Sequence, residues 1–227
     1  MALYKNPSDL KSGMTSINRM LIQGPPNSGK TEAVVRTWPR PLHIQVSPGE
    51  GGHATIPQGL EAIAEGIHAY IPVIDPVSRA ASSLVVQEVE ALTFEILGGK
   101  YGPVTSFCFD GFHKYYLYVL DMVTGGQLFR GENIGSDTDP YVSARFYNRA
   151  REHVRYHVQR INASPVENVV YTCWDGREAD KPQQGFKGPS HIFPDLPGKA
   201  AKEIMGEFGV VVYSTIEWGQ RQPKGLA

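Results

Sequence analysis

The chain has 227 residues, of which 41% are hydrophobic and 20% are charged, and its formal net charge is −1. This size and balance fit one α/β domain with a substantial core, and they exclude a globally basic nucleic-acid-binding protein while allowing a local basic surface. No apolar run approaches the roughly 20 residues of a membrane-spanning helix, and nothing resembles a signal peptide, so no membrane contact is expected. Cys108 and Cys173 lie inside apolar runs, which indicates reduced core thiols and a cytoplasmic protein.

Apolar runs and turn signals predict strands and helices in alternation along the chain. Strands are predicted at 17–23, 41–47, 67–75, 104–110, 167–174 and 209–218. Helices are predicted at 30–38, 58–66, 76–97, 112–123, 140–162 and 198–207, with loops at 124–139 and 175–197. Parallel strands need crossover connections, which are usually helices, so this alternation favours an open, mainly parallel twisted sheet with helices on both faces.

The stretch GPPNSGKT connects the first strand to the first helix and fits the pattern G-x-x-x-x-G-K-[ST] of phosphate-binding loops. In such a loop, backbone N–H groups surround the β-phosphate of a nucleotide, the lysine reaches the β and γ oxygens, and the hydroxyl ligates Mg²⁺. The pattern predicts a nucleotide site made of Gly24, Pro25, Pro26, Asn27, Ser28, Gly29, Lys30, Thr31 and Glu32.

Two carboxylates are candidates for the rest of this site. Asp110 ends the strand SFCFD, where it is placed to hold Mg²⁺ together with Thr31, although it could also cap the following helix. Glu50 follows the second strand in SPGEGGH, where it could polarise the water that attacks the γ-phosphate, or be a solvated loop acid. Lys30 and Glu50 are therefore the predicted catalytic residues. The sequence contains no N-K-x-D motif of GTPases and no clear arginine-rich lid of nucleoside kinases.

The order of these elements resembles the ATPase core of RecA-type recombinases, and it is most similar to the short RecA-like, AAA-type nucleotide-binding proteins of bacteriophages that are linked to single-strand annealing and recombination. The resemblance rests on GPPNSGKT, PLHIQVSPGEGG, SFCFD, NVVYTCW and PDLPGKAAKEIMGEFGVVVY. It covers about 17–217 of a single expected domain, 1–227, with short polar tails. It implies that the hydrolytic glutamate is Glu50 and the metal aspartate is Asp110.

The resemblance also implies partners. It indicates a Mg²⁺-dependent ATPase that acts on single-stranded DNA in the cytoplasm of a phage-infected bacterium, as a homo-oligomer, with phage single-strand-binding or replication proteins as further partners. The family's two DNA-contacting loops correspond to 124–139 and 175–195. Their candidate phosphate contacts are Arg130, Arg177, Lys181 and Lys187, and the candidate stacking surfaces are Trp174, Phe186 and His191.

Other features of the resemblance concern the γ-phosphate. Lys199 and Lys202 are candidates for a cation offered to the nucleotide of the next subunit, or are ordinary surface lysines. The family has a polar sensor, often Gln, at the end of the fifth strand. This chain departs from that pattern, because Thr172, Cys173 and Trp174 stand there.

The predicted helix 140–162 carries a local excess of positive charge. Its apolar stripe, expected to face the core, consists of Val142, Phe146, Ala150 and Val154. Its other faces carry Arg145, Arg149, Arg151, Arg155 and Arg160, with Glu152 as the one acid in the helix. These arginines are either a solvated rim or a surface for DNA phosphates or an acidic neighbouring subunit.

Three other functions stay open at this point. The first is a ring-forming phage DNA motor or helicase-loading ATPase of the same broad class. The second is a nucleotide-gated binding module with little turnover, and the third is a small-molecule kinase. ATPase assays with and without single-stranded DNA would distinguish them.

Overall fold

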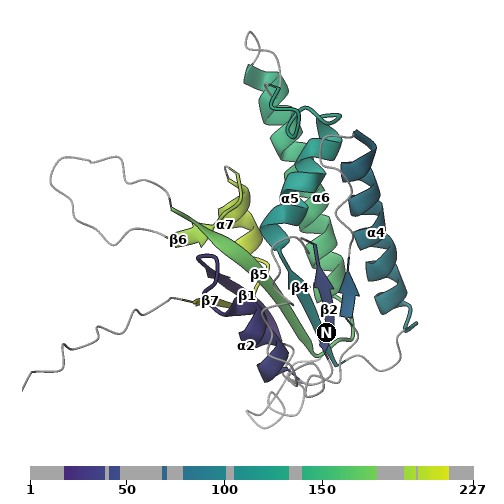
Figure 1. The fold of residues 1–227 in the computed structure, drawn as a ribbon, viewed down its shortest axis with the longest axis vertical. Helices are drawn as coiled ribbons and strands as arrows, with labels where there is room; N and C mark the ends of the chain where they lie inside the picture. Colours follow the sequence, from purple (N-terminus) through teal and green to yellow (C-terminus); the bar gives the residue numbers. More distant parts are fainter. Residues whose placement is uncertain are drawn as a thin grey trace, which may run out of the picture.

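The computed structural model describes residues 18–38, 41–46, 68–70, 79–100, 105–132, 140–177, 192–197 and 199–214. Its elements, drawn in Figure 1, are β1 (Asn18–Gly24), α2 (Lys30–Thr37), β2 (Pro41–Gln45), β3 (His68–Tyr70), α4 (Arg79–Leu97), β4 (Ser106–Asp110), α5 (Phe112–Val123), α6 (Pro140–Asn162), β5 (Asn168–Arg177), β6 (Ile192–Pro194), α7 (Ala200–Met205) and β7 (Val210–Tyr213). None of the helices in these ranges is long and apolar enough to cross a membrane.

Most of the predicted elements are confirmed. The helices expected at 112–123 and 140–162 have those bounds as α5 and α6, whereas the helix expected at 58–66 lies outside the described residues. The prediction of a loop from 175 to 197 is wrong in part. β5 continues through Asp175–Arg177, which pair antiparallel with β6. This polar, glycine-containing segment has no strand pattern of its own. It is extended because it pairs with β6, and that pairing cannot be read from the segment itself.

The strands form a sheet in the order β3-β2-β4-β5-β1-β7, with β6 added to the end of β5. All pairings along that order are parallel, which confirms an α/β fold with a parallel sheet. β5 lies between β1 and β4, so the strand before the glycine-rich loop and the strand that ends in Asp110 are separated by one strand. Because the three are parallel, they end at the same edge of the sheet, which we call the carboxyl edge.

Helices cover both faces of the sheet, as predicted. The chain moves in one direction along the sheet from β1 through α2 to β2, and in the opposite direction through α4, through α5 and α6, and through α7. Right-handed crossovers that run in opposite directions place their helices on opposite faces. Accordingly, α2 packs on a small core of Ile22, Val34, Cys108 and Val170. The other helices cover a larger core that includes Leu21, Phe107, Phe109, Tyr115, Val154, Tyr171 and Ile204.

A buried arginine joins the start of β1 to the connection between α6 and β5. The guanidinium of Arg19 donates hydrogen bonds to the carbonyl oxygens of Asn162, Ser164, Val166 and Glu167 at 2.8 to 3.2 Å. The last carbonyls of a helix have no partner within it, so Arg19 satisfies the Asn162 carbonyl at the end of α6, together with three carbonyls of the connection that follows. Burial lowers the pKa of Arg19 from its ordinary value, although the group stays charged at neutral pH.

Candidate nucleotide-binding site

The glycine loop, residues 24 to 31, turns sharply between β1 and α2 at the carboxyl edge. Asn27 and Gly29 both have left-handed backbone conformations, with φ of 62° and 77°. Asparagine and glycine adopt this conformation at low cost. Gly29 is the N-cap residue of α2 and provides no side chain for capping. The amide N–H groups of the first turn of α2 therefore remain suited to an anion, as the loop pattern predicts.

The first glycine of the loop is required by packing against the chain after β7. A Cβ atom on Gly24 would lie 2.2 Å from the carbonyl oxygen of Ser214. Ser214 holds this position because its N–H donates to the Gln23 carbonyl at 2.8 Å and its hydroxyl donates to the Ser28 carbonyl at 2.6 Å. The chain directly after β7 thus packs against the glycine loop and is hydrogen-bonded to it.

The side chain of Lys30 is buried and curls back over the loop. Its ammonium donates to the carbonyl oxygens of Gly24 at 3.0 Å and Pro25 at 2.7 Å, and to the hydroxyl of Ser28 at 3.3 Å. These loop oxygens orient the charge inside the loop. A phosphate oxygen there would be a stronger acceptor for the ammonium than a neutral carbonyl.

Asp110 is the centre of a buried polar cluster at the end of β4. The Thr31 hydroxyl donates to Asp110 Oδ2 at 2.7 Å, and the Thr172 hydroxyl donates to Asp110 Oδ1. His43 Nε2 lies 3.4 Å from Asp110 Oδ2. Burial opposes ionisation of this carboxyl, but the contacts with His43, Thr172 and Thr31 outweigh it and lower its pKa to about 2. Asp110 is therefore a carboxylate at neutral pH.

The arrangement excludes the capping alternative for Asp110. The N-cap residue of α5 is Gly111, with φ of 84°, and no side chain caps that helix. The Gly111 N–H donates instead to the Thr172 hydroxyl at 3.2 Å. The carboxylate of Asp110 is thus directed toward the start of α2 and not toward its own helix.

The chemistry of Thr31 and Asp110 fits Mg²⁺ shared with a nucleotide. Both supply oxygen donors, and Mg²⁺ sites commonly combine one or two protein ligands with phosphate oxygens and water. Within the described ranges, no group of three or more His, Cys, Asp or Glu side chains could enclose a metal ion by itself. An ion between Thr31 and Asp110 would therefore take its remaining oxygen ligands from a phosphate or from water.

His43 and Thr172 were not predicted as site residues. Both are polar residues inside apolar strands, and both are at least 98% buried. A polar residue near the end of an apolar strand is a signal of a site that can be read from the sequence. The residue that it contacts depends on the order of the strands in the sheet, which the sequence does not show. Thr172 occupies part of the segment where the resemblance implies a sensor, and its hydroxyl contacts the Asp110 carboxylate.

Trp174, a predicted stacking surface, is engaged within the protein. Its ring stacks on His113, with ring centroids 4.4 Å apart, and the ammonium of Lys114 lies 4.8 Å from the centroid of the Trp174 ring. The backbone N–H of Trp174 donates to His113 Nδ1 at 3.4 Å. Burial, with a smaller contribution from the charge of Lys114, lowers the pKa of His113 to about 3, so this imidazole is neutral at physiological pH.

The remaining predicted residues are distributed over several regions. Arg130 forms an ion pair with Glu132, with Nε to Oε1 at 2.6 Å and Nη2 to Oε2 at 2.7 Å. Lys199 and Lys202 are exposed at α7. Outside the described residues lie Glu50, Lys181, Phe186, Lys187 and His191, and the side chain of Arg177. The structure therefore brings together Lys30, Thr31 and Asp110 from the predicted set.

No protein-family profile matches the sequence, and comparison with curated proteins finds no significant match.

Proposed function

We propose that this protein is a Mg²⁺-dependent ATPase with a RecA-like phosphate-loop core. The observation that carries the proposal is the contact between Thr31, at the start of α2, and the ionised Asp110, at the end of β4, beside the buried ammonium of Lys30. One point of the carboxyl edge thus combines a hydroxyl, a carboxylate, an ammonium and a helix N-terminus. These groups match the requirements of a nucleoside triphosphate with its metal.

Each residue has a defined task in this proposal. The N–H groups of the first turn of α2 bind phosphate oxygens, and Lys30 exchanges its carbonyl partners for oxygens of the β- and γ-phosphates. Thr31 and Asp110 hold Mg²⁺, which when bound neutralises phosphate charge. Thr172 and His43 keep the Asp110 carboxylate oriented and ionised. Glu50, assigned by the resemblance alone, orients and deprotonates the attacking water.

We further propose, on the basis of the resemblance, that the ATPase acts on single-stranded DNA in phage-type recombination or strand annealing, and does so as a homo-oligomer. The net charge of the whole chain, −1, does not attract a polyanion. The excess of arginine on α6 is a local positive charge that supports a polyanionic partner. Phage single-strand-binding or replication proteins are proposed as further partners.

The test is nucleotide binding and hydrolysis by single variants. Lys30→Ala is expected to lose most ATP affinity or turnover. Asp110→Asn should lose the Mg²⁺ dependence of ATP binding. Glu50→Gln should bind ATP but hydrolyse it about 10² to 10⁴ times more slowly, as expected for a lost general base. Lys100→Gln removes a charge that pairs with Glu95 on the surface and is the matched control. Normal hydrolysis by Lys30→Ala would contradict the proposal.

A further inference from the structure

The structure divides the arginines of α6 into two groups. Those in the C-terminal half have partners within the protein. Arg151 pairs with Glu203 at 3.1 Å and with Glu152 at 3.2 Å, and Arg155 pairs with Glu207 at 2.9 Å. The guanidinium of Arg160 lies over the ring of Tyr156, 5.6 Å from its centroid. Arg151 and Arg155 therefore attach α7 and the turn after it to α6, and their charges are compensated.

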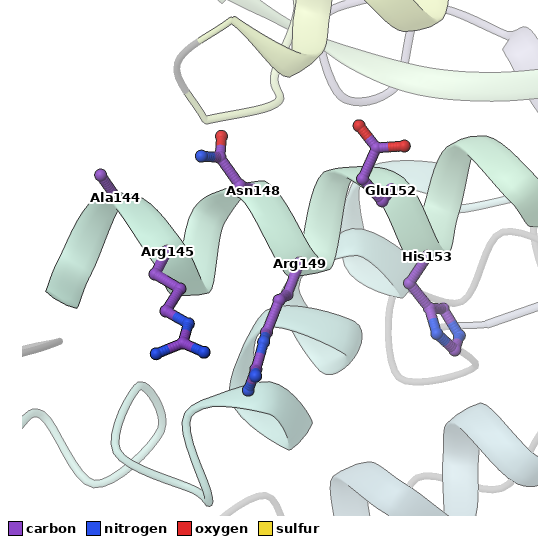
Figure 2. A pocket seen from close by; sticks show the side chains of 6 residues that line it. All are labelled: Ala144, Arg145, Asn148, Arg149, Glu152 and His153. Atoms are coloured by element: carbon purple, nitrogen blue, oxygen red, sulfur yellow. The ribbon is translucent and has the colours of Figure 1, made fainter. Parts of the chain in front are cut away.

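Arg145 and Arg149, in the N-terminal half, form the second group. Both are exposed, and neither forms an ion pair with any residue in the described part of the chain. Together with Ala144, Asn148, Glu152 and His153 they line an open depression on α6. Figure 2 shows both guanidinium groups on the same side of the helix, whereas Glu152 points away from them.

The nearest acids among the described residues have other partners. The Glu152 carboxylate pairs with Arg151 at 3.2 Å. The other ionisable group of the depression, His153, contacts Glu90 of α4 at 2.9 Å. Arg145 and Arg149 thus leave two positive charges directed to one side, in a chain whose formal net charge is −1.

The spacing and position of this pair suit an extended polyanion. Four residues of α-helix rise about 6 Å, so the two guanidinium groups can engage separate phosphates of one strand, each through paired N–H donors. Both belong to the N-terminal half of α6, and Figure 1 shows that this helix extends beyond the other helices at one end.

We propose that Arg145 and Arg149 form a phosphate-binding surface for single-stranded DNA on α6. This surface rests on the DNA-binding role proposed above, and it adds a contact on a rigid helix to the loops implied by the resemblance. In contrast to Arg130, whose charge is paired with Glu132, these arginines form no ion pair with the residues that the structure describes.

The test compares Arg145→Gln/Arg149→Gln with a control, Lys100→Gln/Arg160→Gln, that removes the same charge elsewhere on the surface. Fluorescence anisotropy of a labelled thymidine oligonucleotide is measured over a range of salt concentrations, with an ATP analogue present. Loss of two single-strand contacts should flatten the log–log salt slope by about 1.4 and weaken binding about tenfold at roughly 0.2 M salt and about 70-fold at roughly 0.05 M. The control should keep the wild-type slope, and Arg145→Lys/Arg149→Lys should retain most of it.

The outcomes separate this inference from the proposed function. If the Gln variant binds DNA with wild-type affinity and slope, the surface is refuted while the proposed function stands. If the wild-type protein hydrolyses ATP but binds no single-stranded DNA at low salt, both the surface and the DNA role are refuted. If the Gln variant binds DNA normally but loses self-association in sedimentation, the arginines contact an acidic neighbouring subunit, which also refutes the surface. DNA-independent ATPase activity of the variant confirms that it is folded.

Discussion

His157, on the buried side of α6, should make the stability of this protein depend on pH. Its ring is 97% buried, with ring centroids 4.8 Å from Tyr115 and 5.5 Å from Phe109. Burial, with smaller contributions from the charges of His153 and Arg160, lowers the pKa of His157 to about 3. The imidazole therefore stays neutral in the folded protein over a range in which the unfolded chain binds a proton.

The sign and size of the effect follow from this difference in pKa. The contribution of His157 to stability is complete above its unfolded pKa of about 6.5, and it is lost progressively as the pH falls toward about 3. Between about pH 7.5 and 5.0, the unfolded state gains about 2 kcal/mol from protonation of this one group. Asp110, with a pKa of about 2, stabilises the fold above the usual carboxyl range, so its contribution is lost only at lower pH.

The assay is urea denaturation of the wild type and of His157→Phe at about pH 7.5 and 5.0. Phenylalanine keeps an aromatic ring in the core but cannot be protonated. The variant is therefore expected to lose about 2 kcal/mol less than the wild type between the two pH values, whatever its stability at neutral pH. Tyr156→Phe, on the exposed side of the same turn, should show the wild-type loss. Equal losses in the wild type and His157→Phe would refute the reasoning.

Two further substitutions test the packing around the site and the sheet. Gly24→Ala places a Cβ 2.2 Å from the Ser214 carbonyl, so it should lower the free energy of unfolding by about 1 to 3 kcal/mol, whereas Gly209→Ala, with its nearest neighbour at 3.8 Å, should change it little. Similar denaturation midpoints for the two would contradict the packing of Ser214 against the glycine loop. Arg19→Met removes the donors to four backbone carbonyls and should cost about 2 to 4 kcal/mol in urea denaturation, with Arg145→Met, at an exposed arginine, as the control; a loss below about 0.5 kcal/mol would show that other groups or water satisfy those carbonyls.

The sequence predicted those helices and strands whose residue pattern is contained within the segment itself. Helix α6 begins at Pro140, which suits a first helical position, and its apolar residues recur at helical spacing through Ala150 and Val154, both of which are buried. The antiparallel pairing of Asp175–Arg177, at the end of β5, with β6 was not predicted, because neither of these two short segments has a strand pattern of its own. A pairing between segments distant in sequence leaves no periodic signal in either one.

The candidate site shows the same division. The sequence by itself determined the glycine loop, since the spacing of Gly24, Gly29, Lys30 and Thr31 is a local property of one turn between a strand and a helix. It also identified Asp110 as a candidate, but with two possible roles. Only the tertiary structure decided that this carboxylate points to Thr31. In the fold, β5 places Thr172 between β1 and β4, and Gly111 takes the capping position of α5.

The tertiary structure also decided which arginines of α6 have ion-pair partners. From the sequence, the five arginines of α6 are equivalent, since all lie on one helix with a single acid. In the folded protein α7 brings Glu203 to Arg151, and the turn after α7 brings Glu207 to Arg155, each about fifty residues away in the sequence. Arg145 and Arg149 form no ion pairs in the described structure. Whether a charge is available to a ligand depends on which other charges the fold places beside it, and no local pattern in the sequence contains that information.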